Sequence, residues 1–322
     1  MARILTGIQS TGTPHLGNIL GALIPAISMA NQPENESFLF IADLHSLTQI
    51  KDKSILRENT LSTAATWLAF GLDPEKSVFY RQSDIAEVTE LTWYLLCYFP
   101  FSRLQVAHSF KDKKDRLGDV NGGLFTYPML MAADILLYDA QIVPVGKDQE
   151  QHLEFTRDVA NRFNSQKGDV FVIPEVRLQK DTMLVPGTDG EKMSKSRGNI
   201  INIFLSDKKL RKQVMTISTD SKGLEDPKDP DTCNIFALYR IMATDEQQAE
   251  MREKYTGGGY GYGHAKQALF ELIIDKFSAE RKKYTHLMEH PEEVETALLI
   301  GQKKAREVAS GVLKRVRTEV GY

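Results

Sequence analysis

Short apolar runs alternate with longer segments of helical length along the first part of the chain. Continuous apolar runs that end in turn residues lie at 3–8, 37–42, 78–80 and 141–145, which is typical of buried strands. Segments of helical length follow at 19–29, 54–71, 85–99, 127–138 and 149–163. This alternation predicts a doubly wound α/β domain built on a parallel sheet.

The rest of the chain lacks strand-like runs. Helices are predicted at 206–217, 234–243, 245–255, 265–288 and 292–319, with a turn-forming glycine linker at 257–263. We therefore divide the chain into an α/β domain at 1–200 and an α-helical region at 201–322. Basic residues surround several of these helices, and each cluster taken alone could equally be a solvated face.

Composition restricts the class of protein. The chain has 322 residues, 42% of them hydrophobic and 26% charged, with a net charge of −3, so any contact with RNA must use local patches. Cys97 and Cys233 lie far apart and outside any CxxC pattern, which argues against a zinc or iron–sulfur site and favours a reducing compartment. No apolar stretch is long enough for a bilayer, so we expect a cytoplasmic protein without membrane contact.

The first strand leads into a polar turn, Gln9 to Pro14, and then into His15-Leu16-Gly17-Asn18 at the start of an apolar helix. A strand, a glycine-bearing turn and a helix N-terminus together form the layout of a nucleotide site, with backbone N–H groups facing phosphates. The spacing is neither GxGxxG nor a Walker A loop. His15 taken alone could also be an ordinary residue at a helix start.

A second polar stretch, 189–199, places Lys192 and Lys195 in a loop flanked by Gly187, Gly190 and Gly198. Glycines permit backbone movement and close approach to a ligand. Two lysines in such a loop are usually solvated charge. The alternative interpretation is a loop that binds phosphate as negative charge shifts during a reaction.

The segment 127–138 places Tyr127, Met131 and Asp134 on one helical face, and Pro128 suits the first turn of that helix. Because Asp134 has apolar neighbours, its carboxylate needs a hydrogen-bond donor. That donor could belong to the protein or to a substrate N–H group.

Several of these stretches resemble one known family. Lys192-Met193-Ser194-Lys195-Ser196 matches the KMSKS motif of class I aminoacyl-tRNA synthetases letter for letter, and His15 to Asn18 resembles their HIGH motif in its HxGN form. Gly7 to Gly12 resembles the GIQPSG turn of the tryptophanyl branch, Met131 to Leu136 resembles its MAADIL segment, and 146–152 resembles its GxDQxxH segment. The resemblance covers nearly the whole chain.

The resemblance implies three sets of site residues. ATP would be bound by Gln9, Ser10, Thr11, His15, Gly17, Asn18, Gly146, Asp148, Lys192, Met193, Ser194 and Lys195. Tryptophan would be bound by Leu5, Gly7, His45, Tyr127, Met131, Asp134, Val143, Val145 and Gln149, with Asp134 accepting the indole N–H. Lys192, Lys195, Lys113 and His15 would act in catalysis, with Mg²⁺ on the pyrophosphate and no covalent enzyme intermediate.

The resemblance also implies partners. An insertion at about 48–124 would carry a homodimer contact, and 201–322 would bind the anticodon of tRNA(Trp), with the last helix packing back toward the α/β domain. No DNA contact is expected. The aromatic segment from Trp93 to Phe99, which would contribute to that dimer contact, could equally belong to the core of the subunit.

The expected reaction has two steps. Tryptophan's carboxylate attacks the α-phosphate of ATP, which gives tryptophanyl-adenylate and pyrophosphate. A hydroxyl at the 3′ end of the tRNA then takes the aminoacyl group. Three alternatives stay open: a tyrosyl enzyme of the same architecture, a small-molecule adenylyltransferase, and a non-catalytic RNA-binding relative.

Overall fold

Five parallel strands form the central sheet of the computed structural model, which describes residues 2–107, 120–146, 149–178 and 184–322. The strands are β1 (Ala2–Ile8), β2 (Asn35–Ile41), β3 (Val78–Arg81), β4 (Ile142–Val145) and β5 (Glu175–Leu178), in the order β3-β2-β1-β4-β5. The four strands predicted from apolar runs are confirmed. The strand order reverses between β1 and β4, and ligands of such sheets bind beside that point, at the carboxyl ends of the strands.

Alternate residues of each strand point to opposite faces of the sheet, and each face has its own core. Phe38 and Phe40 pack with the helices α5 (Glu87–Tyr98), α8 (Gly122–Leu136) and α9 (Glu150–Lys167). Leu39 and Ile41 pack on the other face with α2 (Ile24–Ala30) and α4 (Lys53–Ala69). Buried on both faces, the sheet is held between helical layers, as in other parallel sheets.

Helix α8 begins earlier than the position of Pro128 suggested. The side chain of Asn121 accepts the N–H of Leu124 at 3.0 Å and caps a helix that starts at Gly122. Pro128 therefore lies inside the helix, where it removes one backbone donor. The prediction that Pro128 occupies the first turn was wrong, because the capping asparagine fixes the start two turns upstream.

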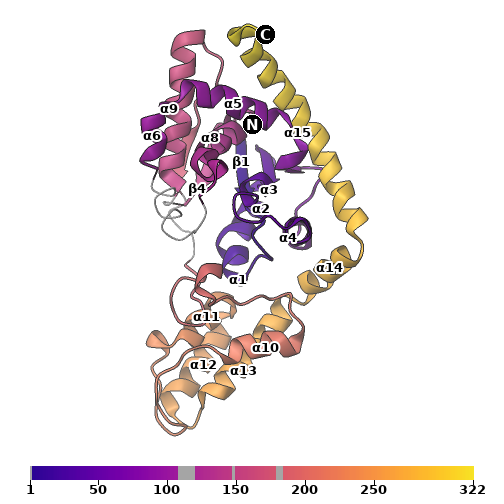
Figure 1. Ribbon diagram of the computed structural model, residues 1–322. Helices are drawn as coiled ribbons and strands as arrows, with labels where there is room; N and C mark the ends of the chain where they lie inside the picture. Colours follow the sequence, from indigo (N-terminus) through magenta and orange to yellow (C-terminus); the bar gives the residue numbers. More distant parts are fainter. Residues whose placement is uncertain (1, 108–119, 147–148, 179–183) are drawn as a thin grey trace.

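The helical region forms a second lobe, drawn in orange at the lower end of Figure 1. It contains α10 (Asp207–Met215), α11 (Asn234–Met242), α12 (Asp245–Gly257) and α13 (Tyr262–Lys276). The next helix, α14 (Ser278–Glu289), packs on α4 of the α/β domain instead. One helix was expected over 265–288, but the chain breaks at Phe277, whose ring is buried 5.9 Å from that of Phe70. None of the helices that the structure describes is long and apolar enough to cross a membrane.

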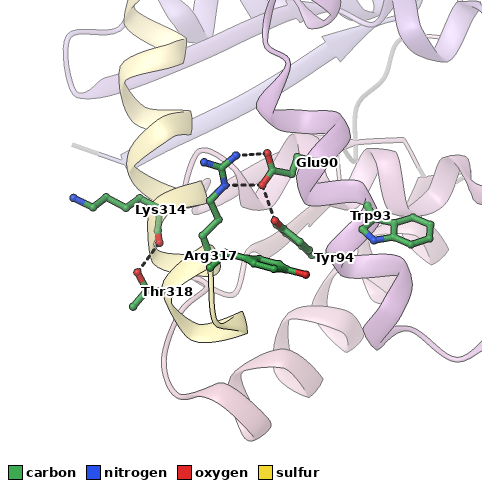
Figure 2. A pocket seen from close by; sticks show the side chains of 7 residues that line it. Glu90, Trp93, Tyr94, Lys314, Arg317 and Thr318 are labelled. Atoms are coloured by element: carbon green, nitrogen blue, oxygen red, sulfur yellow. Dashed lines mark hydrogen bonds and ion pairs between the residues drawn. The ribbon is translucent and has the colours of Figure 1, made fainter.

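The last helix, α15 (Pro291–Val320), runs from α14 along the side of the α/β domain to the helices α5 and α9 (Figure 1). It packs directly against the edge strand β3: a Cβ atom on Gly301 would lie 1.8 Å from the carbonyl oxygen of Phe79. At its far end Arg317 donates to Glu90 on α5 at 2.6 and 2.5 Å, and the Tyr94 hydroxyl also donates to Glu90 (Figure 2). The helix thus covers the open edge of the sheet.

Gly301 allows α15 to lie directly against the backbone of β3, so Gly301→Ala should destabilise the fold. The added methyl group would overlap the backbone of β3, which neither partner can avoid by rotating a side chain, and overpacking of this kind costs about 1–3 kcal/mol or more. We expect a clearly lower thermal unfolding midpoint. Gly311 on the same helix has open space around its Cα, and Gly311→Ala should instead be neutral or stabilising by about 0.5–1 kcal/mol. Equal midpoints for the two variants would contradict this packing.

Candidate active site

The turn after β1 leads into a short helix, α1 (Leu16–Asn18), whose start is fixed by two reciprocal hydrogen bonds. The backbone N–H of Asn18 donates to His15 Nδ1, and the backbone N–H of His15 donates to Asn18 Oδ1, each at 3.3 Å. A single π-helical stretch, η1 (Ile19–Leu23), follows before α2. Such stretches occur frequently at functional sites.

His15 is a neutral hydrogen-bonding group at pH 7. Burial, together with a smaller effect of the nearby charge of Lys195, lowers its pKa to about 4. Because Nδ1 accepts the Asn18 N–H, the single ring proton of the neutral form lies on Nε2. His15 can therefore donate to a ligand oxygen without carrying a charge of its own.

The loop with the two lysines packs onto this turn. Met193 is buried, and its Sδ accepts the N–H of Gly17 at 3.3 Å. The ammonium of Lys195 donates to the carbonyl oxygen of Gly12 at 2.8 Å. Burial lowers the pKa of Lys195 to about 8. Two segments about 180 residues apart in sequence thus meet, and the partly desolvated ammonium of Lys195 lies where they meet.

A buried asparagine, Asn199, fixes the conformation of the loop itself. Its Oδ1 accepts the N–H of Ser194 at 2.8 Å, while its Nδ2 donates to Asp189 Oδ1 at 2.7 Å and to the carbonyl of Lys192 at 3.1 Å. A Cβ on Gly187 would meet the Asn199 side chain at 2.3 Å. In this structure the side chain of Asn199 therefore joins both arms of the loop.

Other residues predicted to bind the nucleotide are placed differently. Lys192 is exposed to solvent. Ser10 is fully buried, and its hydroxyl donates to Ser46 at 3.1 Å and accepts from Thr60 at 3.2 Å, so its side chain faces the interior. Gln9 is exposed, while Thr11, Asn18, Ser194 and Gly146 are half-buried. Lys113 and Asp148 lie outside the described residues.

Asp134 lies at the centre of a second polar cluster. It is 3% exposed, and Gln82 Nε2 lies 2.8 Å from both of its carboxylate oxygens. His45 Nε2 lies 2.9 Å from Oδ2. Burial raises the pKa of Asp134, and the hydrogen bonds from His45 and Gln82 oppose that rise. The carboxylate therefore has donors within the protein, which was one of the two open interpretations, and its oxygens retain lone pairs for a further donor.

Tyr127 and His152 extend this cluster. The Tyr127 hydroxyl lies 2.9 Å from His152 Nε2, and His152 Nδ1 lies 3.1 Å from Gln149 Oε1. The rings of Tyr127 and His45 meet edge to face with their centroids 6.0 Å apart. The residues predicted to bind tryptophan through polar groups thus lie in two hydrogen-bonded groups, which meet where the Tyr127 ring contacts the His45 ring.

The apolar members of that prediction lie on β1, β4 and α8. Leu5, Val143 and Val145 are buried in the core cluster that also contains Ala132 and Ala133 of α8, and Met131 packs against its margin. A Cβ on Gly7 would lie 2.4 Å from the ring of Phe40, so only glycine fits there. β1 and β4 are the two strands between which the strand order reverses.

Gln82 is a site residue that the sequence analysis missed. Its Oε1 accepts the N–H groups of Leu44 at 3.1 Å and His45 at 3.4 Å, which fixes the amide so that Nε2 faces Asp134. A signal was present, because the polar residues Arg81-Gln82-Ser83-Asp84 directly follow the strand predicted at 78–80. Polar residues at the carboxyl end of a parallel strand belong to the edge at which ligands bind.

Within the ranges that the structure describes, no group of three or more histidine, cysteine or acidic side chains could hold a metal ion. The hollow in Figure 2 lies between α5 and the end of α15, and none of its lining residues was predicted to bind a substrate.

Comparison with known proteins identifies the class to which this fold and site belong. The family model of class I tRNA synthetases for tryptophan and tyrosine matches residues 1–278, and the chain belongs to that family. Among its relatives, tryptophan–tRNA ligase of Campylobacter jejuni is 45% identical, with 99% of each chain covered. That of Rhodopirellula baltica is 48% identical, again with 99% of each covered. The family resemblance and the Rossmann-like fold with a helical C-terminal region are confirmed.

Solved structures give the same result. A tryptophanyl-tRNA synthetase of Campylobacter jejuni, solved in complex with ADP and tryptophan, aligns with a TM-score of 0.96 at 44% identity, covering 99% of this chain and 100% of that one. The enzyme of Mycoplasma pneumoniae aligns with a TM-score of 0.82 at 31% identity, covering 100% and 98% of the two chains.

The pKa of Lys195 leads to a prediction about pH. The ammonium is charged below about pH 8 and loses its proton as the pH rises further. If this cation holds phosphate, the affinity for ATP should fall roughly tenfold per pH unit above about pH 8, until the raised pKa in the complex is reached. Calorimetric titration of ATP between pH 7 and 9.5 measures this. Lys195→Arg, which stays charged, should remove the pH dependence, and a flat profile for the parent protein would contradict the role of Lys195.

Proposed function

We propose that this chain is a tryptophan–tRNA ligase, which forms tryptophanyl-adenylate from L-tryptophan and ATP and transfers tryptophan to tRNA(Trp). The observation that carries the proposal is the buried carboxylate of Asp134, oriented by Gln82 and His45 beside Tyr127. The names of the relatives support it, as does the tryptophan and ADP in the Campylobacter jejuni complex.

Amino-acid recognition would depend on hydrogen-bond complementarity. A carboxylate in an apolar site is an acceptor only, so it favours a side chain that presents an N–H group from a flat apolar ring. The indole meets that requirement. A phenylalanine ring would leave the carboxylate without the additional donor, and unpaired buried polar groups allow strong rejection of such analogues.

Adenylate formation would be catalysed by positioning and charge. The attacking carboxylate of tryptophan and the α-phosphate of ATP must be held together while negative charge moves onto the departing pyrophosphate. Lys195, whose ammonium contacts the carbonyl of Gly12 in the turn, would supply positive charge. The neutral His15 would donate a hydrogen bond from Nε2. ATP would enter as its magnesium complex, with the ion on the phosphates. Lys192 and Lys113 remain predicted contributors.

Other parts of the proposal concern assembly and location. We propose the α/β domain at 1–200 as the catalytic domain and the region 201–322 as the anticodon-binding part, in a cytoplasmic homodimer. Support for the dimer comes from large apolar side chains exposed along α5 and α6 (Phe101–Gln105): Trp93 is 65% exposed and Phe101 64%. Exposed apolar surface of this kind marks protein contacts.

The experiment that tests the function is amino-acid-dependent exchange between ATP and pyrophosphate, with tryptophan and tyrosine in separate reactions. We expect exchange with tryptophan and little with tyrosine. Exchange with tyrosine alone would establish the tyrosyl alternative, and the absence of exchange with either would favour a non-catalytic RNA-binding protein.

Asp134→Ala should impair the use of tryptophan while leaving ATP binding unchanged. Loss of a buried charge-assisted bond and of the acceptor for Gln82 should lower kcat/KM for tryptophan by about 10²-fold or more. The measurement is pyrophosphate exchange with tryptophan titrated at saturating ATP. Asp139→Asn is the matched control, because this carboxylate near the end of α8 pairs with Arg315 instead. Parental tryptophan dependence in Asp134→Ala would show that Asp134 serves only internal pairing.

Charges on the apolar surface should disrupt the dimer. Trp93→Glu combined with Phe101→Glu would place carboxylates in a desolvated interface, where each unpaired charge costs several kcal/mol. Light scattering at micromolar concentration should show a dimer for the parent and a monomer for the variant. Leu224→Glu, at an apolar residue 50% exposed in the helical lobe, is the control and should remain dimeric. A monomeric parent would refute the dimer.

A further inference from the structure

The amide of Gln82 depends for its position on a short turn that two separate elements hold. Gln82 is the first residue of a 3₁₀ turn, η2 (Gln82–Asp84), and directly follows Arg81, the last residue of β3. On one side, Ser83 donates its N–H to Asp43 Oδ1 at 3.0 Å and its hydroxyl to Asp43 Oδ2 at 2.5 Å. On the other side, the turn faces α15.

The contact with α15 is a bidentate ion pair, here called a fork, between Arg81 and Glu295. Arg81 donates from its two terminal nitrogens to the two carboxylate oxygens of Glu295, each at 2.7 Å, and from Nε to Asp84 Oδ2 at 2.9 Å. The Arg81 side chain is 24% exposed and that of Asp84 is 20% exposed. A bidentate arginine–carboxylate pair fixes direction as well as distance. Arg81 therefore connects the residue before Gln82, the end of the turn, and the last helix.

The rest of this side of the turn is also anchored. Ile85, immediately after the turn, is 1% exposed in the core. Gly301, less than two turns further along α15 than Glu295, lies against the backbone of Phe79 on β3. The strand end thus has little freedom to move away from α15. A displacement of the strand end would shift the Gln82 amide, which lies 2.8 Å from both oxygens of Asp134.

We propose that Arg81 and Glu295 are positioning residues for amino-acid recognition: their fork sets the turn that presents Gln82 to the Asp134 carboxylate. The proposal rests on the proposed function, since it assigns its effect to the tryptophan site. Neither residue touches the substrate. Both residues would act by fixing the position of Gln82. Through Glu295, the helix α15, which is remote in sequence, would therefore contribute to amino-acid specificity.

The same helix offers a matched control. Arg317 forms a comparable fork with Glu90 on α5, at 2.6 and 2.5 Å. Glu90 also accepts from the Tyr94 hydroxyl, at the surface shown in Figure 2. Both forks fasten α15 to the α/β domain, but only that of Glu295 adjoins the turn with Gln82. Glu295→Ala and Glu90→Ala therefore each remove one arginine–carboxylate attachment of α15, with different neighbours.

The experiment measures tryptophan and ATP dependence of pyrophosphate exchange for the parent, Glu295→Ala and Glu90→Ala, together with thermal midpoints. We expect Glu295→Ala to raise KM for tryptophan by about fivefold, the range for a partly exposed ion pair, with KM for ATP unchanged. Glu90→Ala should lower the midpoint similarly and leave both KM values at the parental level. Equal tryptophan KM values for the two variants would overturn the proposal and leave the fork as a purely structural attachment.

A second comparison separates positioning from general loosening of the fold. In a Gln82→Met background the amide is absent, so adding Glu295→Ala should no longer change KM for tryptophan, although it should still lower the midpoint. Full additivity of the two substitutions in KM would refute an effect through Gln82. If the parent itself shows no tryptophan-dependent exchange, the proposed function fails, which is a result distinct from either outcome above.

Discussion

The cost of burying the carboxylate of Asp134 is the constraint on which the rest of this site depends. An unpaired anion among Ala132, Ala133 and Ile135 would be strongly destabilising, so the fold has to supply donors. It does so from two strand ends: His45 follows β2, and Gln82 follows β3. Because all strands are parallel, their carboxyl ends meet at one edge, and the helix α8 delivers Asp134 to the same place. The sheet topology thus makes a buried carboxylate tolerable and leaves it acceptor capacity for a ligand.

The surface that we propose for the phosphates has the complementary chemistry. There the protein presents a cation, Lys195, and a neutral donor, His15, from two segments that meet only in the folded chain. Met193 joins them through an apolar contact with the turn, and its cluster continues into the helical lobe through Ile201 and Ile203. The loop at 189–199 therefore contributes to the apolar cluster of the helical lobe. The same cluster contains Leu16 and Ile19, which follow the turn, so one apolar core joins the turn, the loop and the helical lobe.

Local sequence patterns predicted many of the helices and strands. Features that depend on contacts between distant parts of the chain were not predicted. The apolar runs located β1 to β4, and helical periodicity placed Tyr127 and Asp134 on one face of α8. The sequence analysis missed β5 because this strand has only four residues, and two of them, Glu175 and Arg177, are charged. It therefore lacks the continuous apolar run by which the other strands were predicted. The break at Phe277 results from tertiary packing against Phe70, which no local pattern contains. The contact of Gln82 with Asp134 and that of Lys195 with Gly12 depend on which strand ends and loops become neighbours in the fold. Sequence spacing alone does not give these neighbours.

We propose that Asp134 recognises the amino acid by accepting its indole N–H. The most direct measurement compares tryptophan with 3-(benzothiophen-3-yl)alanine, in which sulfur replaces the N–H group with little change in shape, by kcat/KM in pyrophosphate exchange. We expect the parent to prefer tryptophan by about 10²-fold or more, because the analogue leaves the buried acceptor unpaired. In Asp134→Ala the preference should fall to a few-fold. Equal use of the two amino acids by the parent would contradict the claim.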